Sequence, residues 1–368
     1  MKQSEAQIRT NRRSFLKKGA LAAGAATMGA GILTGGVSTF AQATGESKGP
    51  LSAGDAAILR FAAAAELIES DLWQQYRELG GVTQGTQNNY QLALQFLDSD
   101  GSQYVTSNST DEASHAAFIN AYLTSKGAEP VDLDQFRTLP SSKATGAEQI
   151  GRLTNLLKTT VDTSWFIRYR SQNNPDFGAT FQQALSIVNR PLIPRDNADF
   201  NDPDHIQAIA NAAGFHFGTI EQGGISLYAT LGQKVTSLEV LKIMFSIGGN
   251  ETLHFLEWVD FAGNAVQGPP FSFAQSQVPV TDHGLTFPNF NSLNDPLFQT
   301  NLIFGVPTEF ISPDLPLANV VRPTGDITSF ATDAVTALTA SGLFAGQSTA
   351  FFSALQTIAQ EADAAKRE

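Results

Sequence analysis

Four segments of the chain place apolar residues at helical spacing and predict amphipathic helices. They cover residues 55–79, 111–126, 205–231 and 237–261. Ser109 and Thr110 are candidate caps at the start of the second helix, and Gly127 is typical of the position after its end. A short helix is expected at 86–97, and a long crossover, 128–204, separates the second and third helices. This order predicts an all-α fold, a four-helix bundle with a long crossover.

The rest of the chain is predicted to surround this bundle. Within the crossover, residues 147–172 show a helical pattern and predict a further helix. Residues 268–323 are rich in Pro, Asn and Phe without a helical period, and such an aromatic composition predicts ordered irregular structure. Residues 326–364 predict one or two helices broken at Ser341-Gly342, so 263–368 is expected to pack on the bundle as an irregular and helical extension. The aromatic residues expected to pack within it are Phe271, Phe273, Phe287, Phe290, Phe298 and Phe304.

Two copies of the pattern Glu-x-x-His are the most informative candidate chemistry. They are Glu112–His115 and Glu251–His254, and the chain has only five His residues. Residues three apart share a face of a helix, so each copy directs a carboxylate and an imidazole the same way. Two copies within apolar helical segments predict a two-metal site. The alternative is a pair of surface ion pairs, which the flanking apolar residues Phe118, Ile119, Leu253 and Phe255 disfavour.

The remaining ligands of such a site are expected on the other two helices. Four-helix carboxylate bundles complete a two-metal site with one Glu from each of them. The first predicted helix offers Glu66, and the third offers Glu221. The chain order is then single Glu, pair, single Glu, pair, which is the order that a duplicated two-helix unit would produce. The predicted metal ligands are Glu66, Glu112, His115, Glu221, Glu251 and His254.

The segments that carry these residues resemble the ferritin-like superfamily, and more closely its exported bacterial, desiccation-related branch. They read FAAAAELIESDLWQQY, DEASHAAFINAYLTSKGAEPV, TIEQGGISLYATL and IGGNETLHFLEWVDF. The resemblance covers about 55–127 and 205–262 and leaves the rest of the chain without a counterpart. It implies a ferritin-like four-helix bundle.

The resemblance also implies a cofactor and a chemistry. Two iron or manganese ions would be bound, with Glu112 and Glu251 bridging them, His115 and His254 each completing one ion, and Glu66 and Glu221 capping them. Such sites act on dioxygen or peroxide, as ferroxidases, manganese catalases or oxidases, and iron itself can be the substrate. Tyr228, seven residues after Glu221, is the candidate catalytic residue. Tyr228 and Trp73 could supply or relay an electron, and the alternative is that both only pack against their neighbours.

The ligand on the first helix has two candidates. Members of the superfamily commonly place an aromatic residue seven positions after the single Glu. Glu66 is followed at that distance by Trp73, and Glu69 is followed by Tyr76. Glu66 is favoured because its Ala neighbours leave room for a buried cluster.

Other residues near these motifs have open or structural interpretations. Asp162, with an aromatic residue seven positions later, makes 147–172 a rival for the third bundle helix. Gly248-Gly249, just before the second Glu-x-x-His, indicates either a π-bulge or a close helix–helix contact. His216 is expected off the ligand face, His205 at a helix start, and His283 in a loop.

The first 43 residues have the features of an export signal. Arg12-Arg13 begins a twin-arginine pattern, a Gly/Ala-rich apolar run follows, and Ala41-Gln42-Ala43 is a cleavage signal. Residues 44–54 then form a linker before the bundle at 55–262. We therefore expect the twin-arginine translocation machinery, which moves folded and cofactor-loaded proteins, to deliver the chain to the periplasm or the exterior.

Composition narrows the chemistry and the partners. The chain contains no Cys, which excludes disulfides, thiolate ligands and iron–sulfur clusters and leaves oxygen and imidazole nitrogen to hold a metal. Residues 44–368 hold 17 of the 23 basic and 34 of the 35 acidic residues, a formal charge of −17, which disfavours nucleic acid as a partner. Two classes of function remain: an exported di-metal oxidoreductase acting on oxygen or peroxide, or a non-catalytic exported stress or desiccation-related protein.

Overall fold

The computed structural model describes residues 49–83, 85–168, 182–265, 281–287, 309–318, 320 and 326–367. These residues belong to one compact unit. The predicted export signal lies outside them, as do five of the six Phe residues expected to pack the extension. The sixth, Phe287, is fully buried.

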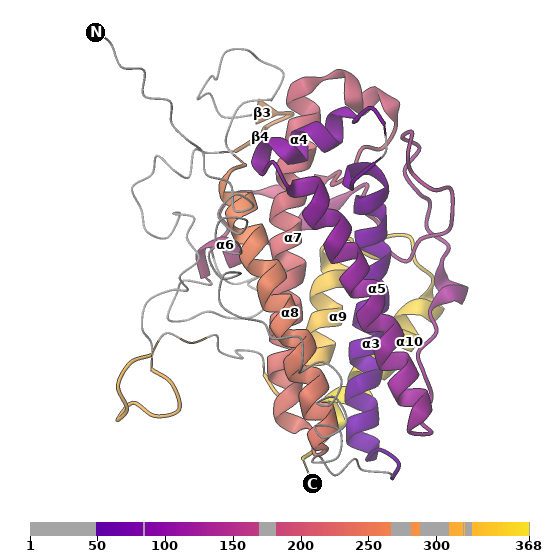
Figure 1. Cartoon of the computed structure of the whole chain (residues 1–368), viewed down its shortest axis with the longest axis vertical. Helices are drawn as coiled ribbons and strands as arrows, with labels where there is room; N and C mark the ends of the chain where they lie inside the picture. The colour runs from indigo at the N-terminus through magenta and orange to yellow at the C-terminus, as the bar shows by residue number, and fades with distance from the viewer. Residues whose placement is uncertain are drawn as a thin grey trace, which may run out of the picture. The chain divides into compact units, whose positions relative to one another are not determined.

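Four long helices run side by side (Figure 1). They are α3 (Ala53–Gly80), α5 (Gly101–Ser125), α7 (Pro203–Leu231) and α8 (Leu238–Gly263). α3 packs along α5, α7 packs along α8, and the long crossover connects α5 to α7. The predicted all-α bundle with a long crossover is confirmed.

Short elements lie between these helices. The helical ones are α4 (Asn89–Leu97), α6 (Trp165–Arg168) and the 3₁₀ turns η1 (Asp134–Phe136), η2 (Asn197–Asn201) and η3 (Gly232–Lys234). The described strands form two antiparallel pairs, β1 (Thr159–Val161) with β2 (Ile187–Arg190), and β3 (Thr281–Asp282) with β4 (Leu285–Thr286). Each pair belongs to a connection between helices, and Val161, Ile187 and Leu285 add their side chains to the hydrophobic core.

Side-chain caps set the starts of α3 and α8. The Ser52 hydroxyl accepts a hydrogen bond from the backbone N–H of Asp55, and the Ser237 hydroxyl accepts one from Val240. The Asp55 carboxylate in turn accepts from the backbone N–H groups of Thr236 and Ser237, each at 2.9 Å. One acidic residue therefore links the starts of two helices that are far apart in the sequence.

α5 begins at Gly101, ten residues before the predicted start. Ser109 and Thr110, predicted as caps, lie inside the helix instead. The added segment is polar, but the hydroxyls of Thr106 and Thr110 donate to carbonyls four residues earlier, at 2.8 and 3.0 Å. Such back-bonding satisfies polar side chains without ending the helix. The end is as predicted, with Gly127 at φ 75°.

Residues 147–168, the described part of 147–172, do not form the predicted helix. They contain loops, β1 and the single turn of α6. The backbone N–H and C=O of Arg152 pair with Leu139 at 2.9 and 3.0 Å, and the N–H of Thr154 donates to the Asp71 carboxylate at 2.9 Å. A helix would need these same backbone groups, so tertiary hydrogen bonds override the local helical pattern.

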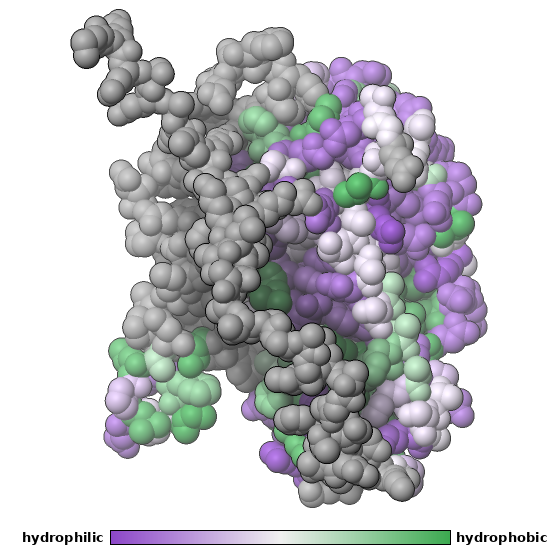
Figure 2. All heavy atoms as spheres, viewed as in Figure 1, coloured by the Kyte–Doolittle hydropathy of each residue, from purple (hydrophilic) through white to green (hydrophobic). Residues whose placement is uncertain are grey.

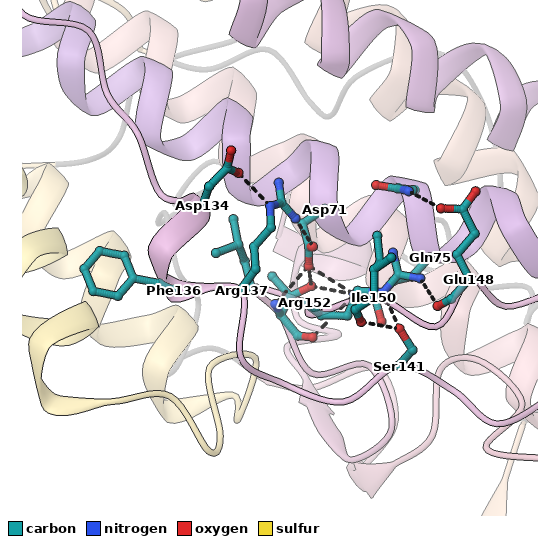
Figure 3. Close-up of polar contacts among 12 residues, drawn as sticks. Asp71, Gln75, Asp134, Phe136, Arg137, Ser141, Glu148, Ile150 and Arg152 are labelled. Atoms are coloured by element: carbon teal, nitrogen blue, oxygen red, sulfur yellow. Dashed lines mark hydrogen bonds and ion pairs between the residues drawn. The ribbon is translucent and has the colours of Figure 1, made fainter.

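Buried charges fasten the crossover to α3 (Figure 3). The Asp71 carboxylate accepts from the Arg137 guanidinium at 2.7 Å. Arg152, which is fully buried, donates to Glu78 at 2.5 Å and to the backbone carbonyl of Glu148 at 2.9 Å. Burying charge is favourable only where the charge is paired and hydrogen-bonded, so these contacts select one path of the chain over α3. Asp71, Glu78, Arg137 and Arg152 are called the crossover anchor below.

Two helices follow in the C-terminal part of the chain, α9 (Phe330–Ala340) and α10 (Thr349–Ala364). α10 packs on α3 and on α9, and α9 also contacts α7. The break between them falls at Ser341-Gly342, where Gly342 has φ 86°. These two helices therefore cover the side of the bundle where α3 and α7 are neighbours.

The described surface is largely hydrophilic in the view of Figure 2. Exposed apolar side chains include Phe118 on α5 and Phe245 and Leu253 on α8. Among the helices of the described part, none combines the length and apolar character that crossing a membrane requires.

Candidate metal centre

The structure brings the six predicted ligands, from four helices, into the interior of the bundle. They form two overlapping groups, Glu66, Glu112, His115 and Glu251 in one, and Glu112, Glu221, Glu251 and His254 in the other. Within each group the ligand atoms lie within 4.8 Å of one another. Glu112 and Glu251 belong to both groups, so they occupy the shared middle of what is called the central cluster below.

The four carboxylates of the central cluster are buried, each residue with 2% or less of its surface exposed. Of the four apolar residues that flank the motifs, Ile119 and Phe255 are buried, whereas Phe118 and Leu253 are 52% and 65% exposed. The two Glu-x-x-His pairs nevertheless face inward, because on a helix adjacent residues point to different sides. Two exposed ion pairs, the alternative reading of the motif, are excluded by this burial.

Two glycines allow the helices to approach at the cluster. A Cβ atom added at Gly224 on α7 would lie 2.2 Å from Oε2 of Glu251 on α8. A Cβ atom at Gly248 would lie 2.7 Å from Cβ of Tyr228. α8 is a continuous α-helix through this point, so the Gly248-Gly249 pair marks a helix–helix contact rather than a π-bulge.

Each imidazole faces the carboxylates of one group. Nδ1 of His115 lies 3.3 Å from Glu66, 3.2 Å from Glu112 and 3.6 Å from Glu251. Nδ1 of His254 lies 3.1 Å from both Glu112 and Glu221. The arrangement therefore contains two imidazole–carboxylate sets that meet at shared carboxylates.

Opposing effects of burial and pairing set the acidity of the carboxylates. Burial raises the pKa of Glu66 to about 8, raises that of Glu251 well above its ordinary value, and raises that of Glu221. Burial acts the same way on Glu112, but hydrogen bonds from His115 and His254 outweigh it and lower its pKa. Glu112 is thus the carboxylate most readily ionised in the cluster.

The imidazoles respond to the carboxylates around them. Burial would lower the pKa of His115, but its hydrogen bonds to Glu112 and Glu66 raise it to about 10. Burial would also lower the pKa of His254, but attraction to Glu221 and hydrogen bonds to Asp111 and Glu112 raise it to about 12. The surrounding carboxylates therefore favour the protonated form of both imidazoles.

The donor set fits a metal cation. Neither oxygen of Glu251 has a hydrogen-bond donor among the described residues, although both atoms are buried. Leaving buried carboxylate oxygens without donors is costly, and a cation between them would remove that cost. Carboxylate oxygen and imidazole nitrogen are ligands that suit iron and manganese.

The family model of the ferritin-like domain matches residues 54–263, which is more than half of the chain. The chain belongs to the ferritin-like domain family. Searches of curated proteins and of solved structures returned no match. The ferritin-like domain contains all six residues of the central cluster, and their arrangement is compatible with a di-metal site.

Several residues of the ferritin-like domain support the cluster and were missed by sequence reasoning. Asn108 donates to Glu112 at 2.7 Å and to Glu221 at 3.0 Å, and its own carbonyl accepts from Trp258 at 2.9 Å. Nε2 of His254 contacts Asp111 at 3.1 Å and Asn250 at 3.3 Å. The signal was present, because Asp111 and Asn250 each stand four residues before a cluster His and thus share its face.

Tyr228, the candidate catalytic residue, lies against the cluster. It is buried, and its hydroxyl donates to Oε1 of Glu66. Trp73 stacks on Trp258 with ring centroids 5.5 Å apart and lies within an aromatic cluster. Tyr228 is therefore in direct contact with a predicted ligand, whereas the described contacts of Trp73 are packing.

Glu69 and Asp162, the alternative ligands, lie outside both groups. Glu69 is half-buried, and burial raises its pKa well above the ordinary value. Asp162 precedes α6 and accepts hydrogen bonds from Ser164 and Gln183. The structure thus gathers Glu66 and Glu221 with the two motifs, and α7 rather than residues 147–172 is the third helix of the bundle.

The remaining histidines have separate environments. Nδ1 of His216 accepts from the Tyr76 hydroxyl at 2.9 Å, and burial lowers the pKa of His216 to about 3. His205, in the first turn of α7, forms with Asp282 and His283 another group of side chains that could hold a metal ion. That group was not foreseen from the sequence. It already has a cationic partner, since the Arg190 guanidinium lies 3.4 Å from Asp282.

Proposed function

We propose that this ferritin-like domain holds two iron or manganese ions and is an oxidoreductase that acts on oxygen or peroxide. The observation that carries the proposal is the pair of overlapping groups that share Glu112 and Glu251. Two ions held close together need carboxylates that reach both of them, and this arrangement supplies two such carboxylates.

Each residue of the central cluster has a distinct part in this proposal. Glu112 and Glu251 would bridge the ions, Glu66 with His115 would complete one ion, and Glu221 with His254 would complete the other. When bound, a pair of iron or manganese ions supplies two-electron chemistry with oxygen or peroxide. Ferrous iron itself is then a possible substrate, as in a ferroxidase.

The surrounding residues would position the ligands and control protons. Asn108 orients Glu112 and Glu221 through its two hydrogen bonds, and Asp111 fixes the ring of His254. Tyr228 holds a proton at Oε1 of Glu66, so it is the nearest group that can deliver a proton or an electron to that side of the cluster. Burial keeps bulk water away from the carboxylates.

We also propose that the protein is exported by the twin-arginine route and belongs with the desiccation-related branch. The pattern at Arg12-Arg13 supports this. The proposed metal site also fits this route, because the twin-arginine machinery exports proteins that have folded and bound their cofactor in the cytoplasm. Replacing both arginines by lysine in the full chain should retain the protein in the cytoplasm. Cell fractionation measures this, and unchanged export would contradict the proposal.

The central test combines metal analysis with turnover. We expect about two iron or manganese ions per purified chain, together with consumption of hydrogen peroxide or oxygen. Tyr228→Phe should retain the metal and lower the turnover rate. Stoichiometric metal without turnover on either oxidant supports the alternative, a non-catalytic exported protein. A chain that binds neither metal after incubation with ferrous or manganous ions would overturn the proposal.

A further inference from the structure

A cavity of about 340 Å³ lies beside the central cluster, between α3 and α7 and under α9 and α10. The β1–β2 pair contributes to one wall. The lining is mainly apolar, and its residues include Ala65, Ile68 and Leu72 on α3 and Ile220 and Leu227 on α7. This volume is in the range of sites that hold small organic molecules.

The cavity and the central cluster use different faces of the same two helices. On α3 the cavity is lined at positions 61, 65, 68, 69 and 72, while Glu66 points to the cluster. On α7 it is lined at positions 216, 219, 220, 222, 223 and 227, while Glu221 points to the cluster. Glu69 stands between the two faces, because it lines the cavity and also interacts electrostatically with Glu66 and Glu221.

The charged residues that line the cavity indicate which charge a bound molecule can carry. It contains no Lys and no Arg among the described residues, whereas Glu69 and Asp162 are acidic. An anion would therefore lack a counter-charge, and a strongly solvated cation would lose its hydration in an apolar space. A neutral, largely apolar molecule fits these walls.

One lining residue carries a polar atom without a partner, and one wall leaves open space. Oε2 of Glu69 is buried and has no hydrogen-bond partner among the described residues. A hydroxyl group can both donate and accept, so it could pair with Glu69 whether or not the carboxyl is protonated. A Cβ atom added at Gly223 on α7 would meet nothing within 4 Å, although this glycine lines the cavity in mid-helix.

We propose that this cavity binds a neutral apolar alcohol or phenol, with the hydroxyl hydrogen-bonded to Glu69 and the hydrocarbon part between α3, α7 and α9. The proposal stands on the cavity itself and does not require metal in the central cluster. A role for the bound molecule as an organic co-substrate would rest in addition on the proposed function.

The test is calorimetric titration of the full purified protein with three probes of similar shape: 4-butylphenol, butylbenzene and 4-butylbenzoate. We expect 4-butylphenol to bind most tightly and the anionic benzoate not to bind. Glu69→Leu should weaken the binding of 4-butylphenol roughly five- to tenfold, the worth of one hydrogen bond, and leave butylbenzene unaffected. Equal binding of the benzoate and the phenol would overturn the proposal.

Cavity-filling variants test the location. Gly223→Leu should weaken 4-butylphenol binding at least tenfold, and Gly249→Leu is its matched control, because a Cβ at Gly249 also meets nothing within 4 Å but lies outside the cavity. Ala337→Phe on α9, with the exposed Thr336→Phe as control, tests the opposite wall without altering α7. Unchanged binding in both filled variants would overturn the proposal.

Metal content measured on the same samples separates the two proposals. Suppose that the chain takes up no metal but binds 4-butylphenol, and that Gly223→Leu blocks this binding. That result supports the cavity proposal and contradicts only the proposed function. A metal-loaded chain with peroxide turnover that binds none of the three probes contradicts only the cavity.

Discussion

The crossover anchor and the central cluster are both buried groups of charged residues on α3 and its neighbours, yet their balance differs. In the anchor, Asp71 pairs with Arg137 and Glu78 pairs with Arg152, and the backbone of Thr154 donates to Asp71 as well. The central cluster holds four carboxylates against two imidazoles, with the raised-pKa Glu69 beside it.

The difference separates a structural network from a candidate site. A buried acid with an arginine and backbone donors needs nothing further, so the anchor stabilises one chain path. A buried acid without donors, such as Glu251, needs a proton or a cation. The anchor is therefore expected to matter for folding, and the central cluster for metal binding.

The largest expected effect is loss of metal on truncating a shared carboxylate. Glu112→Ala or Glu251→Ala should remove most of the bound metal, more than the roughly 10–100-fold weakening expected from loss of a residue that only supports a ligand. Glu221→Ala should leave partial occupancy, and Asp162→Ala should change little. Metal per folded chain, measured by elemental analysis, checks this. Full metal occupancy in Glu251→Ala would contradict the assignment of metal binding to the central cluster, and so its contrast with the crossover anchor.

In the crossover anchor, a substitution is expected to lower stability and leave metal binding unchanged. Arg152→Met should lower the free energy of unfolding by about 3–5 kcal/mol, because it leaves the Glu78 charge buried without its partner. Metal per folded chain should not change. Denaturant unfolding measures the first and elemental analysis the second. Arg60→Met is the control, since its pair with Glu361 is at the surface and should contribute less than about 1 kcal/mol.

Adjacent glycines of α7 offer a finer comparison. Gly224→Ala should displace Glu251, because the added Cβ would overlap Oε2 at 2.2 Å, and should weaken metal binding roughly 10–100-fold. Gly223→Ala places its Cβ in open space and should keep metal affinity while gaining up to about 1 kcal/mol of helix stability. Competition with a metal chelator measures both affinities. Equal affinities would show that Glu251 is not held where the structure has it.

The smallest effect concerns His216, a buried base for which the described residues supply no acidic partner. Its folded pKa of about 3 lies below the ordinary 6.5, so stability is complete above pH 6.5 and falls as the pH decreases toward 3. Between pH 6.5 and 5.5 the free energy of unfolding of the unmodified protein should fall by about 1 kcal/mol more than that of His216→Gln. Glutamine is chosen because its amide can still hydrogen-bond to the Tyr76 hydroxyl. Urea unfolding at the two pH values measures this, and parallel losses would contradict the assignment.

Much of the bundle and the identity of the cluster residues could be predicted from the sequence, because both depend on local periodicity. The 3.6-residue repeat identifies the long helices, and the three-residue spacing of Glu-x-x-His requires that both side chains share a face. The order of single Glu and pair along the chain needs no tertiary information either. Asn108 and Asp111 could have been predicted in the same way, because they stand four residues before Glu112 and His115 and so share their helix face.

Tertiary structure alone decided the rest. Residues 147–172 have a helical pattern, but backbone groups of this segment hydrogen-bond instead to Asp71 and Leu139. Both partners are distant in the sequence. The choice of Glu66 over Glu69, one turn apart, depends on how α3 is rotated against its neighbours. The cavity beside Glu69 exists only because α9 and α10 close over α3 and α7, and no local pattern records which distant segments will meet.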